Sequence, residues 1–336
     1  MTVPPAAAAS QTLTHAPLVL AEALPRFGIA ADAPSELLPV SENVSYRIRP
    51  HGRAAVVVRI SRPGGCELQQ RESELSWVSA LAEAKVAVPI VHRADGGVNT
   101  VITVRPPESQ LNYHVSAFEC VPGTHPAEDD YATVMPKLGA VTAELHEHAS
   151  RWQRPDWFTR PAWDIDAAFG PAPRWGSWRA AVHEKDESEQ LARVEEFVRS
   201  RLLRFGCGPD RFGLIHADLR AANLLVDGTS CRVIDFDDCG FGWLLYDLAT
   251  ALTFTEDHPR VGEFIAAWLQ GYRSVRELSV EDEREIVTFL LLRRMLTIAF
   301  LGNNPDIEVS QQMLPGMVRA TCDWADGIVS GLIADP

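Results

Sequence analysis

The amino-acid sequence predicts an α+β protein with two lobes, a small antiparallel-sheet lobe with one main helix and a larger, mostly helical lobe. Short apolar segments separated by turn residues fill most of the chain from residue 37 to residue 121, which is typical of strands. From residue 131 onward, apolar residues recur at helical spacing over longer segments. A chain of 336 residues with 46% hydrophobic residues is large enough to form two separate cores.

The first lobe is expected to contain several strands and one long helix. Leu75, Val78 and Leu81 share one face of that helix, which lies between the third and fourth strands. We expect the strands at residues 37–40, 45–49, 54–60, 88–93, 100–105 and 111–121, and the helix at residues 67–84.

The second lobe is expected to contain helices and one hairpin, whose strands are joined by the turn Asp227-Gly228. We expect the helices at residues 131–148, 188–204, 244–254, 259–274, 281–301 and 310–332. The lobes are placed at residues 13–119 and 120–336. Residues 1–12 are rich in Ala, Pro, Ser and Thr, and they are expected to form a loose tail.

The charge and the cysteines argue against several classes of protein. The net charge of −14, from 31 basic and 45 acidic residues, argues against a nucleic-acid-binding surface and permits a cationic substrate. The six cysteines show no C-x-x-C spacing, which indicates a reducing compartment without a zinc site. No Lys or Arg precedes Arg26, so a secretory signal peptide is not expected.

The longest apolar segment, residues 289–302, is interrupted by Arg293 and Arg294 and is shorter than a membrane span. It is expected to be a core helix of the second lobe. We therefore expect a cytoplasmic protein that acts without nucleic acid or membrane. The sequence does not indicate an oligomeric state.

Four polar residues have a spacing that suits phosphoryl transfer. Asp218 and Asn223 lie in a loop after His216, and two apolar segments, LLV and RVI, lead from Asn223 to Asp235. If these segments pair as a hairpin, Asn223 and Asp235 come to the same end of it. An amide oxygen and a carboxylate suit Mg²⁺, which keeps part of its shell for water and phosphate oxygens. Asp218 would accept a hydrogen bond, and finally the proton, from an attacking hydroxyl. The alternative is a polar hairpin whose acidic residues cap turns.

This stretch resembles the catalytic segment of the aminoglycoside phosphotransferase-like kinases, a superfamily related in fold to protein kinases. The family pattern is H-x-D-x-x-x-x-N, then I-D-F/W-D/E, and then D-L-A. Its positions are taken here by His216, Asp218, Asn223, Asp235, Phe236, Asp237 and Asp247-Leu248-Ala249. The resemblance extends more weakly from about Leu37 to Gly302 and implies a two-lobe protein-kinase-like fold.

The resemblance implies an ATP- and Mg²⁺-dependent phosphotransferase. It would move the γ-phosphate to a hydroxyl of a small molecule such as an amino sugar, an amino alcohol or a hydroxy amino acid. Asp218 would be the base, with His216 bracing its loop. Asn223 and Asp235 would hold the metal, and Asp247 would support the loop from below.

Two other functions stay open at this point. One is a protein Ser/Thr kinase of the stress-response type, although the short interval from Asp235 to Tyr246 leaves little room for an activation segment. The other is a non-catalytic nucleotide-binding module, which the absence of a glycine-rich loop would fit and which the intact Asp218 argues against.

In the first lobe, Arg59 takes the place of the Lys with which a kinase binds the α- and β-phosphates. A guanidinium binds phosphate oxygens through two N–H groups. Glu74 is its expected partner, with Glu72 as the rival, because Glu74 shares the apolar face of the helix. Asn43 and Ser45, in the turn before the second strand, would contact a phosphate or else belong to an ordinary polar turn.

The segment at residues 117–123 is the expected hinge between the lobes. Backbone groups of Glu119 and Val121 would hold the adenine ring there, because backbone amides read a purine edge whatever the side chain. Phe118 and Val121 would line the adenine or simply belong to the core.

More than half of the nine tryptophans lie between Trp152 and Trp178, near several aspartates. Aromatic faces beside carboxylates would bind a cationic amine. The alternative is that the tryptophans pin a long connection to the core. The Arg293-Arg294 pair would meet an anionic acceptor or form a solvated edge of its helix.

Overall fold

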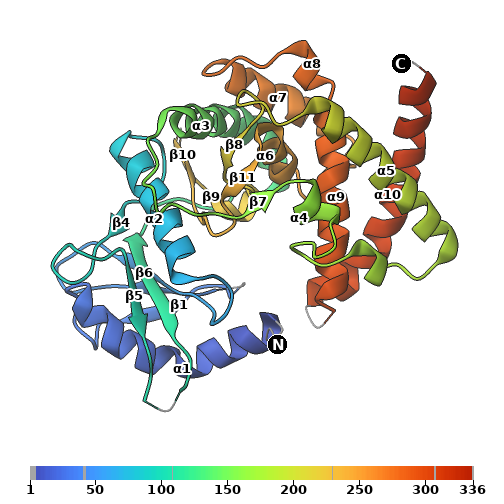
Figure 1. Cartoon of the computed structure of the whole chain (residues 1–336). Coiled ribbons are helices and arrows are strands. Elements are labelled where there is room, and N and C mark those ends of the chain that lie inside the picture. Colours follow the sequence, from blue (N-terminus) through green and yellow to red (C-terminus); the bar gives the residue numbers. More distant parts are fainter. Residues whose placement is uncertain (1–4, 41–42, 108, 229, 306–307, 335–336) are drawn as a thin grey trace. The chain divides into compact units, whose positions relative to one another are not determined.

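The computed structural model (Figure 1) describes residues 5–40, 43–107, 109–228, 230–305 and 308–334. The chain forms two compact units. Unit 1 consists of residues Met1–Gly123, Gln153–Arg160 and Arg232–Asp237, and unit 2 consists of Thr124–Trp152, Pro161–Cys231 and Asp238–Pro336. The predicted α+β composition, with a small sheet unit and a larger helical unit, is confirmed. Two short later segments join unit 1, whereas the expected first lobe ended at residue 119.

Unit 1 is built on a six-stranded antiparallel sheet with the strand order β1-β2-β3-β6-β4, in which β5 also pairs with β6. The central strand β3 has the sequence VVVRI, and such β-branched residues favour a strand buried on its faces. The strands are β1 (Ser35–Leu37), β2 (Val44–Ile48), β3 (Val56–Ile60), β4 (Val91–His92), β5 (Val101–Val104) and β6 (Tyr113–Glu119).

Two helices, α1 (Pro5–Arg26) and α2 (Leu68–Glu83), contact this sheet. Ala16, Val19, Ala23 and Leu24 repeat at helical spacing on α1 and belong to the same buried cluster as residues of β2, β3 and β6. Residues 5–12 of the segment that was expected to be a loose tail are therefore helical, because Ala is the strongest helix former and the following turns have a core to cover. The helix expected at residues 67–84 is α2.

Unit 2 is mostly helical. The helix α9 has consecutive buried residues from Thr288 to Ala299, and α5, α6 and α10 pack against it. A helix that is apolar all round belongs in a core, as expected for this segment. Arg293 and Arg294 are both buried in α9, so the alternative of a solvated edge was wrong. The helices are α3 (Tyr131–Arg151), α4 (Ile165–Phe169), α5 (Lys185–Phe205), α6 (Leu244–Ala251), α7 (Val261–Arg273), α8 (Val280–Glu283), α9 (Ile286–Asn303) and α10 (Glu308–Ala334).

Two small sheets position the loops of unit 2. The order β7-β11-β8 joins β7 (Ala162–Trp163), β8 (Phe212–Ile215) and β11 (Gly240–Trp243), and the predicted hairpin is formed by β9 (Leu224–Asp227) and β10 (Ser230–Val233). Gly228, in the hairpin turn, has a φ of 54°, a conformation that glycine adopts without steric cost. Within the described residues, no helix combines the length and the apolar character that a bilayer span requires.

Candidate active site

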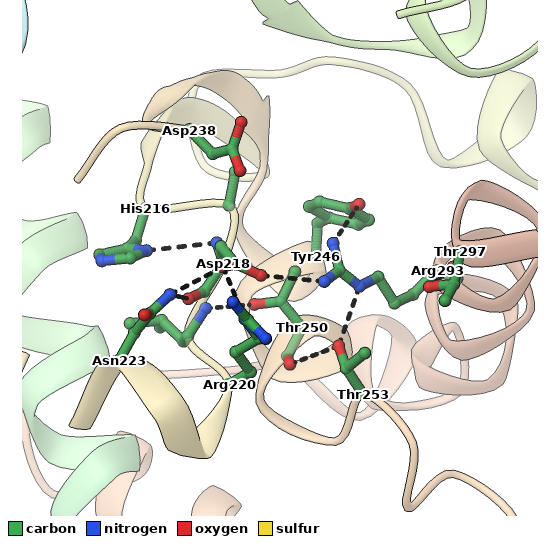
Figure 2. A network of polar contacts seen from close by, with 12 residues as sticks. His216, Asp218, Arg220, Asn223, Asp238, Tyr246, Thr250, Thr253, Arg293 and Thr297 are labelled. Atoms are coloured by element: carbon green, nitrogen blue, oxygen red, sulfur yellow. Dashed lines mark hydrogen bonds and ion pairs between the residues drawn. The ribbon is translucent and has the colours of Figure 1, made fainter. Parts of the chain in front are cut away.

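The loop between β8 and β9 carries Asp218, and its carboxylate is the centre of a polar network (Figure 2). Oδ1 accepts a hydrogen bond from Arg293 at 2.9 Å. Oδ2 accepts hydrogen bonds from Asn223 Nδ2 at 2.7 Å and from Arg220 Nε at 3.0 Å. The predicted neighbours Asp218 and Asn223 are thus brought together, and two arginines join them.

Opposing effects set the pKa of Asp218. Burial alone would raise it, but the positive charges of Arg293 and then Arg220 outweigh burial and lower the pKa below its ordinary value. Asp218 is therefore a carboxylate at neutral pH. A carboxylate has about four acceptor positions, and the three side-chain donors named above leave room for one more hydrogen bond.

Asp247 supports the loop from below, as the family resemblance implied. Its two carboxylate oxygens accept the backbone N–H groups of His216 at 3.1 Å and Ala217 at 2.7 Å. Asp247 is fully buried and also pairs with His146 Nε2 at 3.0 Å. Ala217 has a φ of 67°, a strained conformation for a residue with a Cβ, which the surrounding hydrogen bonds hold in place. The strain lies directly next to Asp218.

His216 lies against this loop, as expected of a bracing residue. Its Nδ1 accepts the backbone N–H of Asp218 at 3.2 Å. Because Nδ1 acts as an acceptor, the proton of a neutral ring lies on Nε2. Thr250 adds a further brace, since its hydroxyl accepts the backbone N–H of Leu219 at 2.9 Å.

Unit 1 carries the second group of predicted residues. Arg59 of β3 donates to Glu74 of α2 at 2.8 Å, so Glu74, and not Glu72, is the partner. Arg59 also lies 3.5 Å from Asp235, a carboxylate that is 39% exposed. Burial raises the pKa of Glu74, but Arg59 and then Arg71 outweigh it and keep the pKa below its ordinary value. The buried pair is thus ionised on both sides.

Asp235 lies directly after β10 in a left-handed backbone conformation, with a φ of 62°. The segment that follows is tied down through Asp237, which forms an ion pair with Arg71 and accepts a hydrogen bond from Asn43. Its backbone carbonyl accepts a hydrogen bond from Arg160. Such contacts can hold a strained residue that the backbone alone would relax.

The other predicted residues of unit 1 have mixed outcomes. Ser45 lies opposite Arg59 in the β2–β3 ladder, whereas Asn43 donates to Asp237 at 2.7 Å. The expected turn also includes Ser41 and Glu42, which lie outside the described residues. The backbone N–H of Glu119 donates to Ile90 O at 2.8 Å, so it is already used within the sheet. The backbone carbonyl of Glu119 and the backbone of Val121 stay the predicted partners for a purine.

The Trp-rich segment contains both structural and exposed aromatic rings. Trp163 and Trp178 are buried and pin the connection, whereas Trp157 is largely exposed. Trp163 stacks on Tyr246 at 5.8 Å between ring centroids and contacts Trp175 edge-on at 5.0 Å. The guanidinium of Arg293 lies over the Trp175 ring at 5.1 Å from its centroid. One tryptophan of this segment, Trp175, therefore contacts Arg293, the partner of Asp218.

The sequence did not reveal the arginines that contact the predicted site residues and the segments around them. It had suggested only an anionic acceptor or a solvated edge for Arg293, and had assigned nothing to Arg71, Arg160 or Arg220. A signal for Arg293 was present, since a charged residue inside an apolar core helix is almost always paired. For Arg71, no periodicity distinguishes a buried guanidinium from a solvated one.

Comparisons with known proteins find similarity over most of this chain. Residues 37–279 match the family model described as the phosphotransferase enzyme family. Amicoumacin kinase of Bacillus subtilis (strain 168) is 24% identical over 322 residues, which cover 91% of each protein.

Solved structures are similar over nearly the whole chain. A microcompartment-associated aminopropanol kinase is 39% identical with a TM-score of 0.85, over 94% of this chain and 98% of that one. The amicoumacin kinase hAmiN, in complex with AMP-PNP, Ca²⁺ and Ami, has a TM-score of 0.77 at 22% identity, over 91% of this chain and 92% of that one. The second similarity bears on the fold alone.

Proposed function

Because the chain belongs to the phosphotransferase enzyme family, we propose that it transfers the γ-phosphate of ATP to the hydroxyl of a small amino alcohol. The observation that carries the proposal is the 39% identity to an aminopropanol kinase over 94% of this chain. The polar network around Asp218 supports it, since phosphoryl transfer depends on positioning and charge stabilisation.

Asp218 would accept a hydrogen bond from the acceptor hydroxyl and orient its oxygen toward the phosphorus. Asp247 clamps the loop by accepting the backbone N–H groups of His216 and Ala217. Together with this clamp, the contacts from Arg293 and Asn223 hold the Asp218 carboxylate in one place. Positioning of this kind lowers a barrier without requiring a strong base. The proton would pass to Asp218 as the new O–P bond forms, and no phosphoenzyme is needed.

The nucleotide would be held by unit 1. Arg59, kept charged by Glu74 and adjacent to Ser45, is suited to the α- and β-phosphates. Backbone groups of Glu119 and Val121 are proposed for the adenine edge. Asn43 is more directly engaged with Asp237, so its role would be to hold that segment.

Mg²⁺ is the implied metal, and the proposed ligands are Asn223 and Asp235. Asn223 turns its amide nitrogen to Asp218, so the oxygen of the same amide is the atom that would face a cation. Asp235 offers a partly exposed carboxylate. Both are hard oxygen donors, as Mg²⁺ prefers. When bound, the ion would neutralise charge on the nucleotide phosphates.

The test is phosphate transfer from ATP to a panel of acceptors: 1-amino-2-propanol, ethanolamine, choline, homoserine, an amino sugar and a generic protein. We expect uptake by the amino alcohols that Asp218→Ala abolishes while nucleotide binding persists. Asp235→Ala is expected to weaken binding of the magnesium nucleotide in calorimetry. Transfer to the protein alone, or to no acceptor, would reject the proposal.

A further inference from the structure

A guanidinium of the chain itself occupies a cation-binding arrangement in unit 2. Arg174 lies over the ring of Trp163, 4.7 Å from the ring to the guanidinium carbon, and Arg174 Nη2 lies 3.4 Å from Asp238 Oδ1. An aromatic face and a carboxylate on one cation are also the partners that recognise an alkylammonium ion. Arg174 and Asp238 are 31% and 30% exposed, whereas Trp163 is buried.

The Trp163 ring is tied to the segment that carries Asp238. Its indole donates Nε1–H to the backbone carbonyl of Asp238 at 2.8 Å. Trp163 also lies in β7, which pairs with β11. The contact from Arg174 is weaker, because 3.4 Å is long for a charge-assisted hydrogen bond. A cation that forms a shorter bond to Asp238 would compete with it.

This arrangement is connected to Asp218 through Tyr246. The Tyr246 ring stacks on Trp163, and its hydroxyl accepts a hydrogen bond from Arg293, the partner of Asp218, at 3.3 Å. Burial is the main cause that raises the pKa of Tyr246 to about 12, and the charges of Asp218 and Asp238 both add to it. Both carboxylates therefore act on one phenol, and Figure 2 shows Asp218 at the centre of the network with Asp238 nearby.

We infer that Trp163 and Asp238 form the subsite for the ammonium group of the acceptor, and that Arg174 holds this subsite until an acceptor displaces it. The inference rests on the proposed function and extends it to the residues that select the substrate. Exchange of one cation for another leaves the charge of the subsite unchanged, so Asp238 stays paired throughout.

A similar arrangement elsewhere in unit 2 supplies a matched control. Arg179 lies 4.3 Å from the centroid of the Trp178 ring and pairs with Glu195. Glu195, however, also binds Arg199 and the Trp178 indole, so this second group is a self-contained structural cluster. Arg179 has no role in the proposed reaction.

The test measures kinetics and binding for Asp238→Asn, Arg174→Gln and Arg179→Gln. The acceptors are 1-amino-2-propanol and its neutral analogue 1,2-propanediol. For the amine, Asp238→Asn is expected to raise KM and the calorimetric Kd about tenfold or more, the loss of one charge-assisted hydrogen bond. For the diol, Asp238→Asn should change neither KM nor Kd. Arg174→Gln is expected to lower KM for the amine about three- to tenfold, the loss of one exposed competing cation.

Arg179→Gln should leave all values unchanged. An Asp238→Asn enzyme with the wild-type Kd for the amine overturns the inference, as does an Arg174→Gln enzyme with a raised KM, because Arg174 would then bind the acceptor itself. A wild-type protein that binds no amine also overturns it. A wild-type protein that binds the amine by calorimetry but never phosphorylates it rejects the proposed function and leaves the ammonium subsite standing.

Discussion

Replacement of Arg293 by Met should destabilise the protein through Asp218. In the native structure Arg293 is buried and donates to Asp218 Oδ1 at 2.9 Å and to Thr253 Oγ1 at 2.9 Å. Met fills most of the volume but leaves the carboxylate without its main counter-charge. Removal of one partner of a buried ion pair costs about 3–5 kcal/mol.

For Arg293→Met, the loss in the free energy of unfolding is expected near the lower end of this range, at about 3 kcal/mol. Asp218 keeps two donors, Asn223 Nδ2 at 2.7 Å and Arg220 Nε at 3.0 Å, so its charge is not fully orphaned. The Arg220 side chain is 40% exposed and compensates weakly because water screens it. Asp218→Asn removes the charge, so the double variant should be more stable than the sum of the single losses implies.

The assay is urea unfolding followed by tryptophan fluorescence, for both single variants and the double variant. We expect a coupling energy of about 1.5–3 kcal/mol between positions 218 and 293. The control is Arg294→Met in the same helix, since Arg294 is equally buried but pairs with Glu256 and Thr321. Losses for positions 218 and 293 that add within about 0.5 kcal/mol would refute the argument.

The same pair predicts a pH dependence. The pKa of Asp218 is lower in the folded chain than the value of about 3.9 expected when unfolded. The stability that this shift contributes is fully present above about pH 4 and is lost as the pH falls through the folded pKa. In Arg293→Met the folded pKa rises, so the loss of stability between about pH 4 and more acidic values should become smaller.

Three further predictions concern other parts of the chain. Asp247→Asn keeps one acceptor for the loop amides and should lower kcat about 100-fold with little change in the KM for ATP; an unchanged kcat would contradict the clamp. Gly271→Ala places a Cβ 1.8 Å from Pro136 O, and should lower the free energy of unfolding by about 1–3 kcal/mol in urea. Gly262→Ala, on the same helix with no atom within 4 Å, should not. Glu74→Gln leaves the Arg59 charge buried, and should raise the KM for ATP and not that for the acceptor.

The features that the sequence predicted are those with a local signal. The strand β3 follows from a run of β-branched residues, and the hairpin β9–β10 follows from two apolar segments around Asp227-Gly228. The pairing of Arg59 with Glu74 follows from the helical period, because only Glu74 shares a face with Val78 and Leu81.

The features that were missed depend on contacts between distant segments. Arg293 meets Asp218 across 75 positions of the chain, and Asp238 meets Arg174 across 64. Neither pair leaves a trace in local periodicity. The helix α1 was missed for a related reason, since its alanine-rich start has little amphipathic pattern and its apolar face is recognisable only once the sheet beneath it is known.

The contacts of Asp218 bear on how the proposed reaction would proceed. A carboxylate with a lowered pKa and three donors is a weak base, and a weak base cannot remove a proton from an alcohol before the alcohol attacks. A loose phosphoryl-transfer transition state does not require early removal, because the hydroxyl becomes acidic only as its oxygen bonds to phosphorus. Arg293, Arg220 and Asn223 therefore favour a fixed position for Asp218 over basicity. The strained Ala217 and the clamp from Asp247 serve the same end, because both fix where this carboxylate lies.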